Sequence, residues 1–320
     1  MKKVACVGIL VADVIVEPVN GYPAPGMLQL VNSITLHNGG NAMTAAINLH
    51  KMGVDSKMVG KVGDDMFGVF LRDRLQKAGV DTRALKTDDA VQTSASVAML
   101  QSSGERSFLH CVGTNATFSI DDVDFDVIDE CDLVFVTGTY LLDRFDGAET
   151  AAFLKKCKEM GKTTFLDVCW DAKGRWSELL DEAMPYIDFF MPSIDEAMKI
   201  AGVDSKDPEP IADIFMAKGA KNVVIKVGKR GAYLRLAGQT KGEIYPTLDD
   251  VKVVDTTGAG DSFCSGFLAA YARDVAPEEC VAFANAVGSL CVTEKGATTG
   301  IRSYEETLEF KKAHKLMIVD

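Results

Sequence analysis

A run of small residues between two aspartates, Asp255-Thr256-Thr257-Gly258-Ala259-Gly260-Asp261, contains the residue types that phosphoryl transfer requires. Gly258, Ala259 and Gly260 carry little or no side chain, so backbone N–H groups there can approach an anion closely. The run opens an apolar, helix-forming segment, and the free N–H groups and positive dipole end of a helix start favour phosphate. Asp261 would stand beside these donors, where its carboxylate could take the proton of an attacking hydroxyl.

The same run has a simpler interpretation, because aspartate is common at helix starts whatever a protein does. That interpretation is sufficient for an isolated Gly-Ala-Gly-Asp string. Here the string extends over residues 255–263 and lies between a strand-like segment, residues 251–254, and an apolar helical segment, residues 263–271. A strand, a glycine-rich turn and a helix in this order favour an anion site.

The larger part of the chain alternates strand-like and helical patterns, which predicts βαβ units around a mostly parallel sheet. The strand candidates are residues 133–136, 163–168, 189–191 and 223–227. Apolar residues at helical spacing predict helices at residues 148–160, 194–201, 211–218, 261–273, 277–293 and 304–316.

The first third of the chain has a different pattern. A strand candidate at residues 4–9 is followed by helix candidates at residues 41–52 and 66–78. β-Prone stretches are interleaved with these helices at residues 28–36, 93–100 and 107–111, and the last two flank a turn at Ser102-Ser103-Gly104. We expect a single domain over residues 1–320, in which residues 11–38 and 92–112 form a small β-rich subdomain.

Composition limits the partners of the protein. The net charge is −12 and no basic stripe is present, which disfavours nucleic acid and anionic membrane surfaces. Eight scattered cysteines without a CxxC pair fit reduced thiols in the cytoplasm, and four histidines without ligand spacing argue against zinc. Asp13 interrupts the first apolar run, so we expect a buried strand there and a soluble protein without a membrane span.

Three other catalytic motifs are absent from the sequence. No G-x-x-x-x-G-K-[ST] string is present, which excludes a P-loop kinase. No G-x-G-x-x-G follows the first strand candidate, which argues against a dinucleotide-dependent dehydrogenase. No G-x-S-x-G elbow supports hydrolase chemistry.

Two separated signatures resemble those of the ribokinase-like (PfkB) carbohydrate and nucleoside kinases. The run at residues 255–261 is similar to the family's D-T-x-G-A-G-D pattern, and Gly39-Gly40-Asn41 with residues 59–68 resembles its N-terminal signature. The resemblance extends over essentially the whole chain. It implies a Rossmann-like, mostly parallel central sheet flanked by helices, with a small β-rich lid, in an ATP-dependent kinase.

The resemblance also implies roles for individual residues. Asp261 would be the general base beside Gly258, Ala259 and Gly260, and the acceptor would be held by Asp13, Gly39, Gly40, Asn41 and Asn115. The nucleotide would be contacted by Lys226, Gly228, Gly231, Thr257, Asn285 and Gly288. Glu196 would act on Mg²⁺ through water, and Asp255 resembles part of the monovalent-cation site of potassium-stimulated relatives.

Several of these residues also have ordinary explanations. Asp13 could be a turn residue, Glu196 a first-turn helix acid and Lys226 a surface lysine at a strand end. Ser193 stands where the family usually has Asn, and Lys226 stands where Thr is frequent.

The acceptor is left open among several classes. Val11, Thr44 and Gly138-Thr139 differ from ribokinase itself, whereas Lys226 and residues 167–171 resemble other sugar kinases, including 2-keto-3-deoxygluconate-type members. We therefore expect a kinase of a sugar or sugar acid. The alternatives are a nucleoside kinase of the adenosine or inosine type, and a non-catalytic sensor of sugar or nucleotide on the same fold. Because lids of relatives pair across a two-fold axis, the resemblance also implies a homodimer formed through the lid.

Overall fold

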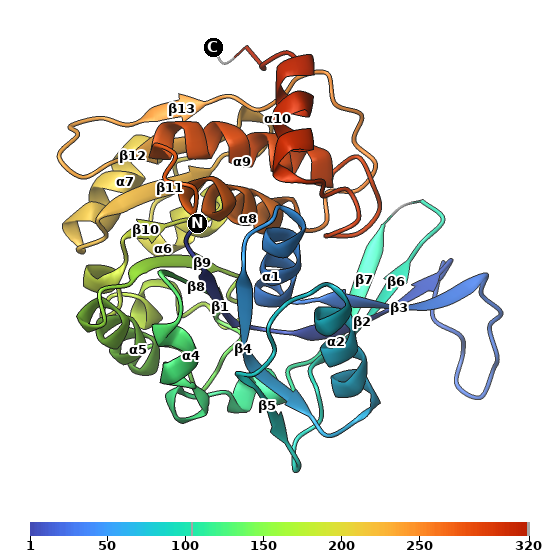
Figure 1. Cartoon of the computed structure of the whole chain (residues 1–320). Coiled ribbons are helices and arrows are strands. Elements are labelled where there is room, and N and C mark those ends of the chain that lie inside the picture. Colours follow the sequence, from blue (N-terminus) through green and yellow to red (C-terminus); the bar gives the residue numbers. More distant parts are fainter. Residues whose placement is uncertain (104, 319–320) are drawn as a thin grey trace.

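The computed structural model describes residues 1–103 and 105–318, so Gly104 of the expected turn lies outside the described residues (Figure 1). Nine strands form the main sheet in the order β13-β12-β11-β10-β9-β8-β1-β4-β5. Their bounds are β1 Val4–Gly8, β4 Ser56–Gly63, β5 Leu85–Asp88, β8 Leu133–Thr139, β9 Thr163–Val168, β10 Phe189–Phe190, β11 Asn222–Lys226, β12 Ala232–Arg235 and β13 Glu243–Tyr245.

The main sheet is parallel from β5 to β11, and β12 and β13 add an antiparallel edge. The predicted alternation of strands and helices after residue 130 is confirmed. Since the crossovers leave all parallel strands pointing one way, the ends of β9 and β11 reach the same edge of the sheet. Ligands of open α/β sheets bind at this carboxyl edge.

Helices cover both faces of the main sheet. They are α1 Asn41–Lys51, α2 Met66–Lys77, α3 Thr114–Thr117, α4 Phe125–Asp129, α5 Ala148–Glu159, α6 Ile194–Ala201, α7 Pro208–Ala217, α8 Ala259–Tyr271, α9 Pro277–Cys291 and α10 Tyr304–Ala313. Short 3-10 helices lie at Ile120–Asp122, Trp176–Leu179, Met184–Tyr186 and Gly228–Arg230. Within the described ranges, no helix combines the length and apolar character needed to cross a membrane.

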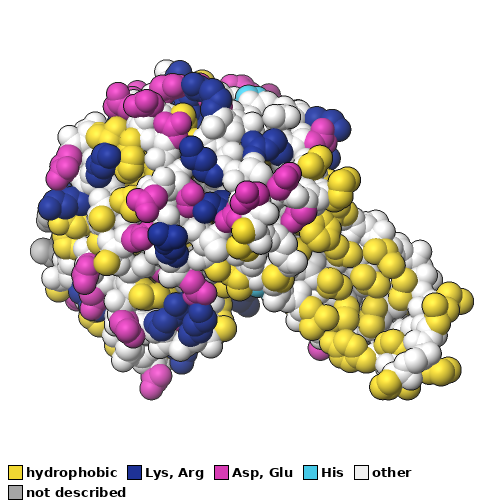
Figure 2. Space-filling view, turned by 90° about the horizontal axis from the view of Figure 1, so that it is seen from below, with side chains coloured by type: hydrophobic (Ala, Val, Ile, Leu, Met, Phe, Trp, Pro, Cys, Tyr) yellow, Lys and Arg dark blue, Asp and Glu magenta, His cyan; other side chains and the backbone are white. Residues whose placement is uncertain are grey.

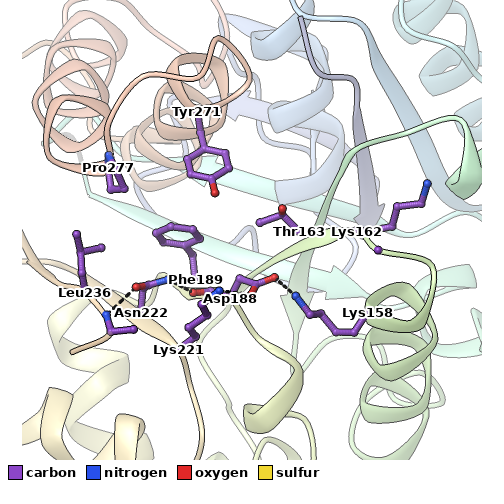
Figure 3. Close-up of a pocket in the computed structure, with 12 residues that line it drawn as sticks. Lys158, Lys162, Thr163, Asp188, Phe189, Lys221, Asn222, Leu236, Tyr271 and Pro277 are labelled. Carbon is purple, nitrogen blue, oxygen red and sulfur yellow. Dashed lines mark hydrogen bonds and ion pairs between the residues drawn. The ribbon is translucent and has the colours of Figure 1, made fainter. Parts of the chain in front are cut away.

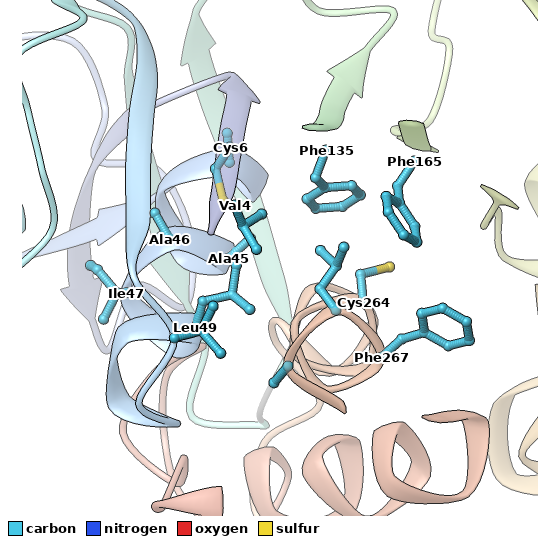
Figure 4. Close-up of a cluster of buried hydrophobic side chains, with 14 of the residues drawn as sticks. Val4, Cys6, Ala45, Ala46, Ile47, Leu49, Phe135, Phe165, Cys264 and Phe267 are labelled. Carbon is cyan, nitrogen blue, oxygen red and sulfur yellow. The ribbon is translucent and has the colours of Figure 1, made fainter. Parts of the chain in front are cut away.

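The alternation of side chains along the buried strands produces two cores, one on each face of the main sheet. On β1, Val4 and Cys6 enter the core beneath α1, α8 and α9, whereas Ala5 and Val7 enter the core beneath α4 to α7. Figure 4 shows the first core, in which Phe267 and other side chains of α8 lie near aromatic side chains of the sheet. Helix α8, which begins at the glycine-rich turn, is therefore fixed along its length by buried packing.

A separate small sheet projects from the main body (Figure 1). Its strands lie in the order β3-β2-β6-β7, with bounds β2 Val11–Glu17, β3 Ser33–Gly39, β6 Ala95–Leu100 and β7 Arg106–Cys111. The expected separate β-rich unit is thus confirmed, while its action as a lid stays a prediction. The β-prone stretch at residues 28–36 becomes a strand only from residue 33 onward.

The strand expected at residues 251–254 is wrong. These residues form no ladder, and Val253 and Val254 are about half exposed. The edge of the main sheet is already occupied by β13, and the segment instead bonds to the end of α9, where Val254 N–H donates to the carbonyl of Val292 at 2.7 Å. The turn before α8 is therefore held by a helix end rather than by a strand.

Candidate active site

The glycine-rich turn has the conformation that an anion site needs. Gly258 caps α8 with φ of +74°, a left-handed conformation that favours glycine. A Cβ atom at this position would also come within 2.2 Å of the Cβ atom of Ala297. The first N–H groups of α8 have no partners within the helix and lie at its positive end, and that of Ala259 makes a long hydrogen bond of 3.3 Å to the carbonyl of Thr256 in the preceding turn.

Asp261 lies in the first turn of α8 and is oriented by α1. The Nδ2 group of Asn41, the first residue of α1, donates to Asp261 Oδ1 at 2.7 Å. Burial raises the pKa of Asp261, although the charge of Lys226 and the hydrogen bond from Asn41 oppose this. The carboxyl is thus a stronger base than an exposed aspartate, which suits it to remove a proton from a hydroxyl.

Asp13 approaches the same region from β2 of the small sheet. Its carboxylate lies against the backbone of Gly39, where a Cβ atom would meet Asp13 Oδ2 at 1.9 Å. Gly40 has φ of +87°, and a Cβ atom there would meet the carbonyl of Ile9 at 2.5 Å. Burial raises the pKa of Asp13 to about 6. The absence of side chains at Gly39 and Gly40 therefore leaves room for the half-buried Asp13 carboxylate beside the segment that leads into Asn41.

Asn115 lies near the start of β2, but its side chain is already hydrogen-bonded within the protein. Its Nδ2 group donates to the carbonyl of Leu10 at 2.9 Å, and its Oδ1 accepts from the N–H of Leu10 at 3.3 Å. These bonds hold the link between β1 and β2. Contact between Asn115 and a substrate stays a prediction.

A cavity of about 520 Å³ lies beside Asp261. Asn41, Glu196 and Lys226 line it, together with Asp167 at the end of β9. Glu196 belongs to the first turn of α6, where its Oε2 accepts from the N–H of Ser193 at 2.8 Å, and burial raises its pKa. Within the described residues, no group of three or more His, Cys, Asp and Glu side chains is arranged to hold a metal ion.

A second cavity of about 400 Å³ brings together most of the residues expected to contact nucleotide: Lys226, Gly228, Gly231, Asn285 and Gly288. Apolar side chains, among them those of Phe263 and Leu248, form much of its wall. Thr257 lines neither cavity, whereas its neighbour Thr256 lines both.

The two cavities share part of their walls. Thr256, Ala259, Gly260, Gly228 and Lys226 line both of them. The glycine-rich turn therefore lies at the junction between a largely apolar cavity and a cavity that contains Asp261. This arrangement suits the passage of a phosphoryl group from a nucleotide to a hydroxyl.

Asp167 was not predicted as a site residue. Its Oδ2 accepts a hydrogen bond from Lys226 Nζ at 2.7 Å, and both side chains are largely buried. Burial disfavours the charged ammonium, but nearby acidic groups, Asp167 first among them, outweigh it and raise the pKa of Lys226. The available signal in the sequence was an acid near the carboxyl end of a buried strand.

Asp255 holds the start of the turn together. Its Oδ1 accepts from the N–H of Thr257 at 3.0 Å, and its Oδ2 accepts from the N–H of Gly296 at 3.0 Å. Arg106 of β7 donates to Asp255 Oδ1 at 3.3 Å and also to the hydroxyl of Thr257. These contacts of Arg106 were not predicted from the sequence. Binding of a monovalent cation at Asp255 stays a prediction.

Another pocket lies at the opposite, amino edge of the main sheet (Figure 3). Its charged side chains are paired within the protein: Lys158 and Lys221 with Asp188, and Lys162 with Asp129. It contains none of the expected site residues. We therefore place the chemistry at the carboxyl edge.

Comparison with known proteins gives the family of the chain. A model described as the pfkB family carbohydrate kinase matches residues 1–303. The chain belongs to the pfkB family. It is 27% identical to the 2-dehydro-3-deoxygluconokinase of Bacillus subtilis over 91% of each chain. It is 30% identical to the fructokinase of Klebsiella pneumoniae over 85% of this chain and 90% of that one.

A solved structure of Arabidopsis thaliana ribokinase complexed with ribose and ATP matches with a TM-score of 0.84. The identity is 25%, and the match covers 97% of this chain and 99% of that chain. The ribokinase-like fold is thereby confirmed. This pfkB-family kinase is a phosphotransferase that acts on a hydroxyl group, and its acceptor class is sugar or nucleoside.

Proposed function

We propose that this pfkB-family kinase transfers the γ-phosphoryl group of ATP to a hydroxyl of a sugar or sugar acid, with Asp261 as the general base. The observation that carries the proposal is the junction of the two cavities at the glycine-rich turn, directly before Asp261. A nucleotide on one side and an acceptor on the other would meet at this turn. Both relatives compared above are named as kinases of such acceptors.

The reaction follows from the groups around the turn. The acceptor hydroxyl attacks the γ-phosphorus while Asp261 takes its proton, and Asn41 holds the carboxylate in place through the bond to Oδ1. N–H groups of Ala259 and Gly260 stabilise the negative charge of the phosphoryl group in transfer. ADP leaves with the electron pair of the broken P–O bond.

The second cavity fits the nucleotide. Its apolar wall, which includes Phe263 and Leu248, suits a purine ring, and Asn285 and Gly288 lie on α9 beside it. Mg²⁺ would be held mainly by phosphate oxygens and water where the two cavities join, with Glu196 of the cavity beside Asp261 as an outer partner, since hydrated Mg²⁺ needs few protein ligands. Bound there, it would neutralise part of the phosphate charge.

The part of the site that carries Asp13 and Asn41 fits a polyol. Asp13 and Asn41 offer hydrogen-bonding groups, and Asn41 also lines the cavity beside Asp261. Gly39 and Gly40 do not line that cavity, and their missing side chains leave room for Asp13 and for the backbone of Ile9 and Leu10. The small sheet carries Asp13 and would close over the acceptor as a lid, which would keep water from being phosphorylated.

The experiment is ADP release from Mg-ATP across a panel of sugars, sugar acids and nucleosides, with and without K⁺. We expect ADP release that depends strongly on one sugar or sugar acid. Release that depends on a nucleoside instead would overturn the acceptor class, and binding of ATP without release for any acceptor would favour a sensor.

We also propose a homodimer formed through the small sheet. The strand registers place Ile34 and Leu36 of β3, Val14 of β2 and Leu109 of β7 on one face, opposite the face that carries Asp13. Ile34, Leu36 and Leu109 are exposed, and Figure 2 shows an apolar surface over the projecting part. Exposed apolar patches of this kind often mark protein interfaces. Light scattering of the native chain and of Leu36→Glu tests this, and a monomeric native chain would contradict it.

A further inference from the structure

Lys226 occupies the place where the phosphoryl group must pass. Its side chain lines both the cavity beside Asp261 and the nucleotide cavity. The ammonium also borders the glycine-rich turn, since a Cβ atom on Gly260 would lie 3.6 Å from Lys226 Nζ. A positive charge therefore stands beside the N–H groups that are to hold the transferred phosphoryl group.

The ammonium is fixed in this place by residues from two other elements. Lys226 ends β11, and Asp167 lies near the end of β9, with β10 between them in the main sheet. Nζ donates to Asp167 Oδ2 at 2.7 Å and lies 3.7 Å from the Sγ atom of Cys264 on α8. Asp167 is itself held, because its Oδ1 accepts from the N–H of Val168 at 2.9 Å. The pair thus joins β9, β11 and α8 directly behind the turn.

The pair differs from an ion pair that only supports a core. A buried ion pair generally gains little stability over apolar side chains of the same size. Here the Asp167 side chain is 2% exposed, whereas that of Lys226 is 13% exposed and forms part of a cavity wall. A lysine ammonium has three N–H donors, and Asp167 and Cys264 account for two of them. One donor is left to face the cavity.

We propose that Lys226 is a catalytic residue whose ammonium contacts the γ-phosphoryl group during transfer, and that Asp167 is the positioning residue that holds it. This inference rests on the proposed kinase function and assigns a residue pair to the transfer step. The bond from the acceptor oxygen to phosphorus forms as the bond from phosphorus to the ADP oxygen breaks. The hydroxyl proton goes to Asp261, and Lys226 keeps its proton throughout.

The effect should fall on kcat rather than on nucleotide affinity. The charge spread over the transferred group is largest in the transition state, so a fixed cation acts most strongly there. Removal of one such donor from an anion site typically lowers kcat by about 10²–10³-fold. A residue that only held ADP would instead change its dissociation constant and leave kcat in place.

The test uses Lys226→Met, Asp167→Asn and the double variant. Lys226→Met leaves Asp167 buried without its partner and could unfold for that reason alone. The double variant removes both charges and leaves no unpaired ion, so it separates folding from catalysis. Thermal unfolding, ADP affinity by calorimetry, and kcat and KM with the accepted substrate are measured for each.

We expect Lys226→Met and the double variant to lose about 10²–10³-fold in kcat, with ADP affinity within about threefold of the native value. Asp167→Asn should lose about tenfold in kcat in the native background and nothing further in the Lys226→Met background, because it acts through the lysine. A folded double variant with native kcat would overturn the inference. So would a loss confined to ADP affinity.

A second measurement does not depend on turnover. Affinity for ADP with aluminium fluoride, which imitates the transferred phosphoryl group, is compared with affinity for ADP alone. Lys226→Met should lose at least tenfold more affinity for the first than for the second, and equal losses would overturn the role of Lys226. If ADP binds but no acceptor supports turnover, the proposed function fails while this comparison still decides the role of the lysine.

Discussion

Asp261 and Asp13, the two aspartates assigned to the reaction, have different structural support. Asp261 lies on α8, whose buried face packs against the main sheet between other helices. Asp13 lies on a small projecting sheet, of which one face exposes Ile34 and Leu36. The groups on the Asp261 side come from elements that cannot shift without disturbing the core, whereas the Asp13 side belongs to a separate sheet, for which we predict movement as a unit.

This difference separates the chemistry from the choice of acceptor. A general base and an anion turn must be held to within a fraction of an ångström, and a close-packed core does this. A sheet that closes over the acceptor can change its contacts without changing the transfer step. We therefore expect substitutions on the Asp261 side to change mainly kcat and substitutions on the Asp13 side to change mainly the KM for the acceptor.

The largest effect is expected for Asp261→Asn. The variant keeps the size of the side chain and an acceptor for Asn41, but it cannot take a proton, so kcat should fall by about 10²–10⁴-fold. Because burial raises the pKa of Asp261, native kcat should rise with pH through that raised pKa. The pH–rate profile of the variant should lack this rise.

Asp13→Asn is the matched comparison, and it should alter mainly the KM for the acceptor. Near-native kcat in Asp261→Asn would remove the base from its role.

The next effect concerns the turn itself. Gly258 and Gly174 have nearly the same φ, +74° and +71°, but a Cβ atom would meet Ala297 at the first position and open space at the second. Gly174→Ala should cost about 1–2 kcal/mol of unfolding free energy from the left-handed conformation alone. Gly258→Ala should cost about 1–3 kcal/mol more from the clash and should lower kcat at least tenfold. Urea unfolding and initial rates test this, and equal behaviour of the two variants would show that the turn is not tightly held.

The turn could be predicted from sequence because its determinants are local. Gly258, Gly260 and Asp261 are neighbours in the chain, and a short string fixes their conformation. The pair of Lys226 with Asp167 could not be predicted, because it depends on which strand ends lie together in the main sheet. The strand expected at residues 251–254 failed for a related reason, since apolar residues there meet the end of α9 instead of a sheet edge.

Asp13 should stabilise binding of the acceptor while it destabilises the fold. Burial raises its pKa from 3.8 to about 6, so the folded chain holds the proton more tightly than the unfolded chain does. The carboxyl therefore lowers stability as the pH rises from about 4 through 6, and the cost is complete above that range. Asp13→Asn should gain about 1–2 kcal/mol of unfolding free energy at pH 7.5, after allowance for partial exposure, and almost nothing near pH 4.

The same variant should raise the KM for the acceptor at pH 7.5. Asp89→Asn, at an exposed position on the surface, is the control and should change neither quantity. Urea unfolding at the two pH values gives the first result, and initial rates give the second. A loss of stability at pH 7.5 in Asp13→Asn would show that the carboxylate is better satisfied in the folded protein than its burial indicates.

The smallest effect is expected where the two regions touch. Arg106 of β7 is 40% exposed and reaches Asp255, whose side chain is 18% exposed, so it links the small sheet to the start of the turn. Exposed ion pairs contribute about 0.2–1 kcal/mol, and Arg106→Gln should therefore raise the KM for the acceptor by at most about fivefold. Salt screens such a pair, so native KM should rise between low and high salt while the KM of the variant should change less.

Arg144→Gln removes a similar exposed pair with Asp121 elsewhere on the surface and serves as the control. If Arg106→Gln keeps the native KM and its salt dependence, the contact does not hold the small sheet to the turn, and the two regions are joined through Asn41 and the Gly-Gly segment instead.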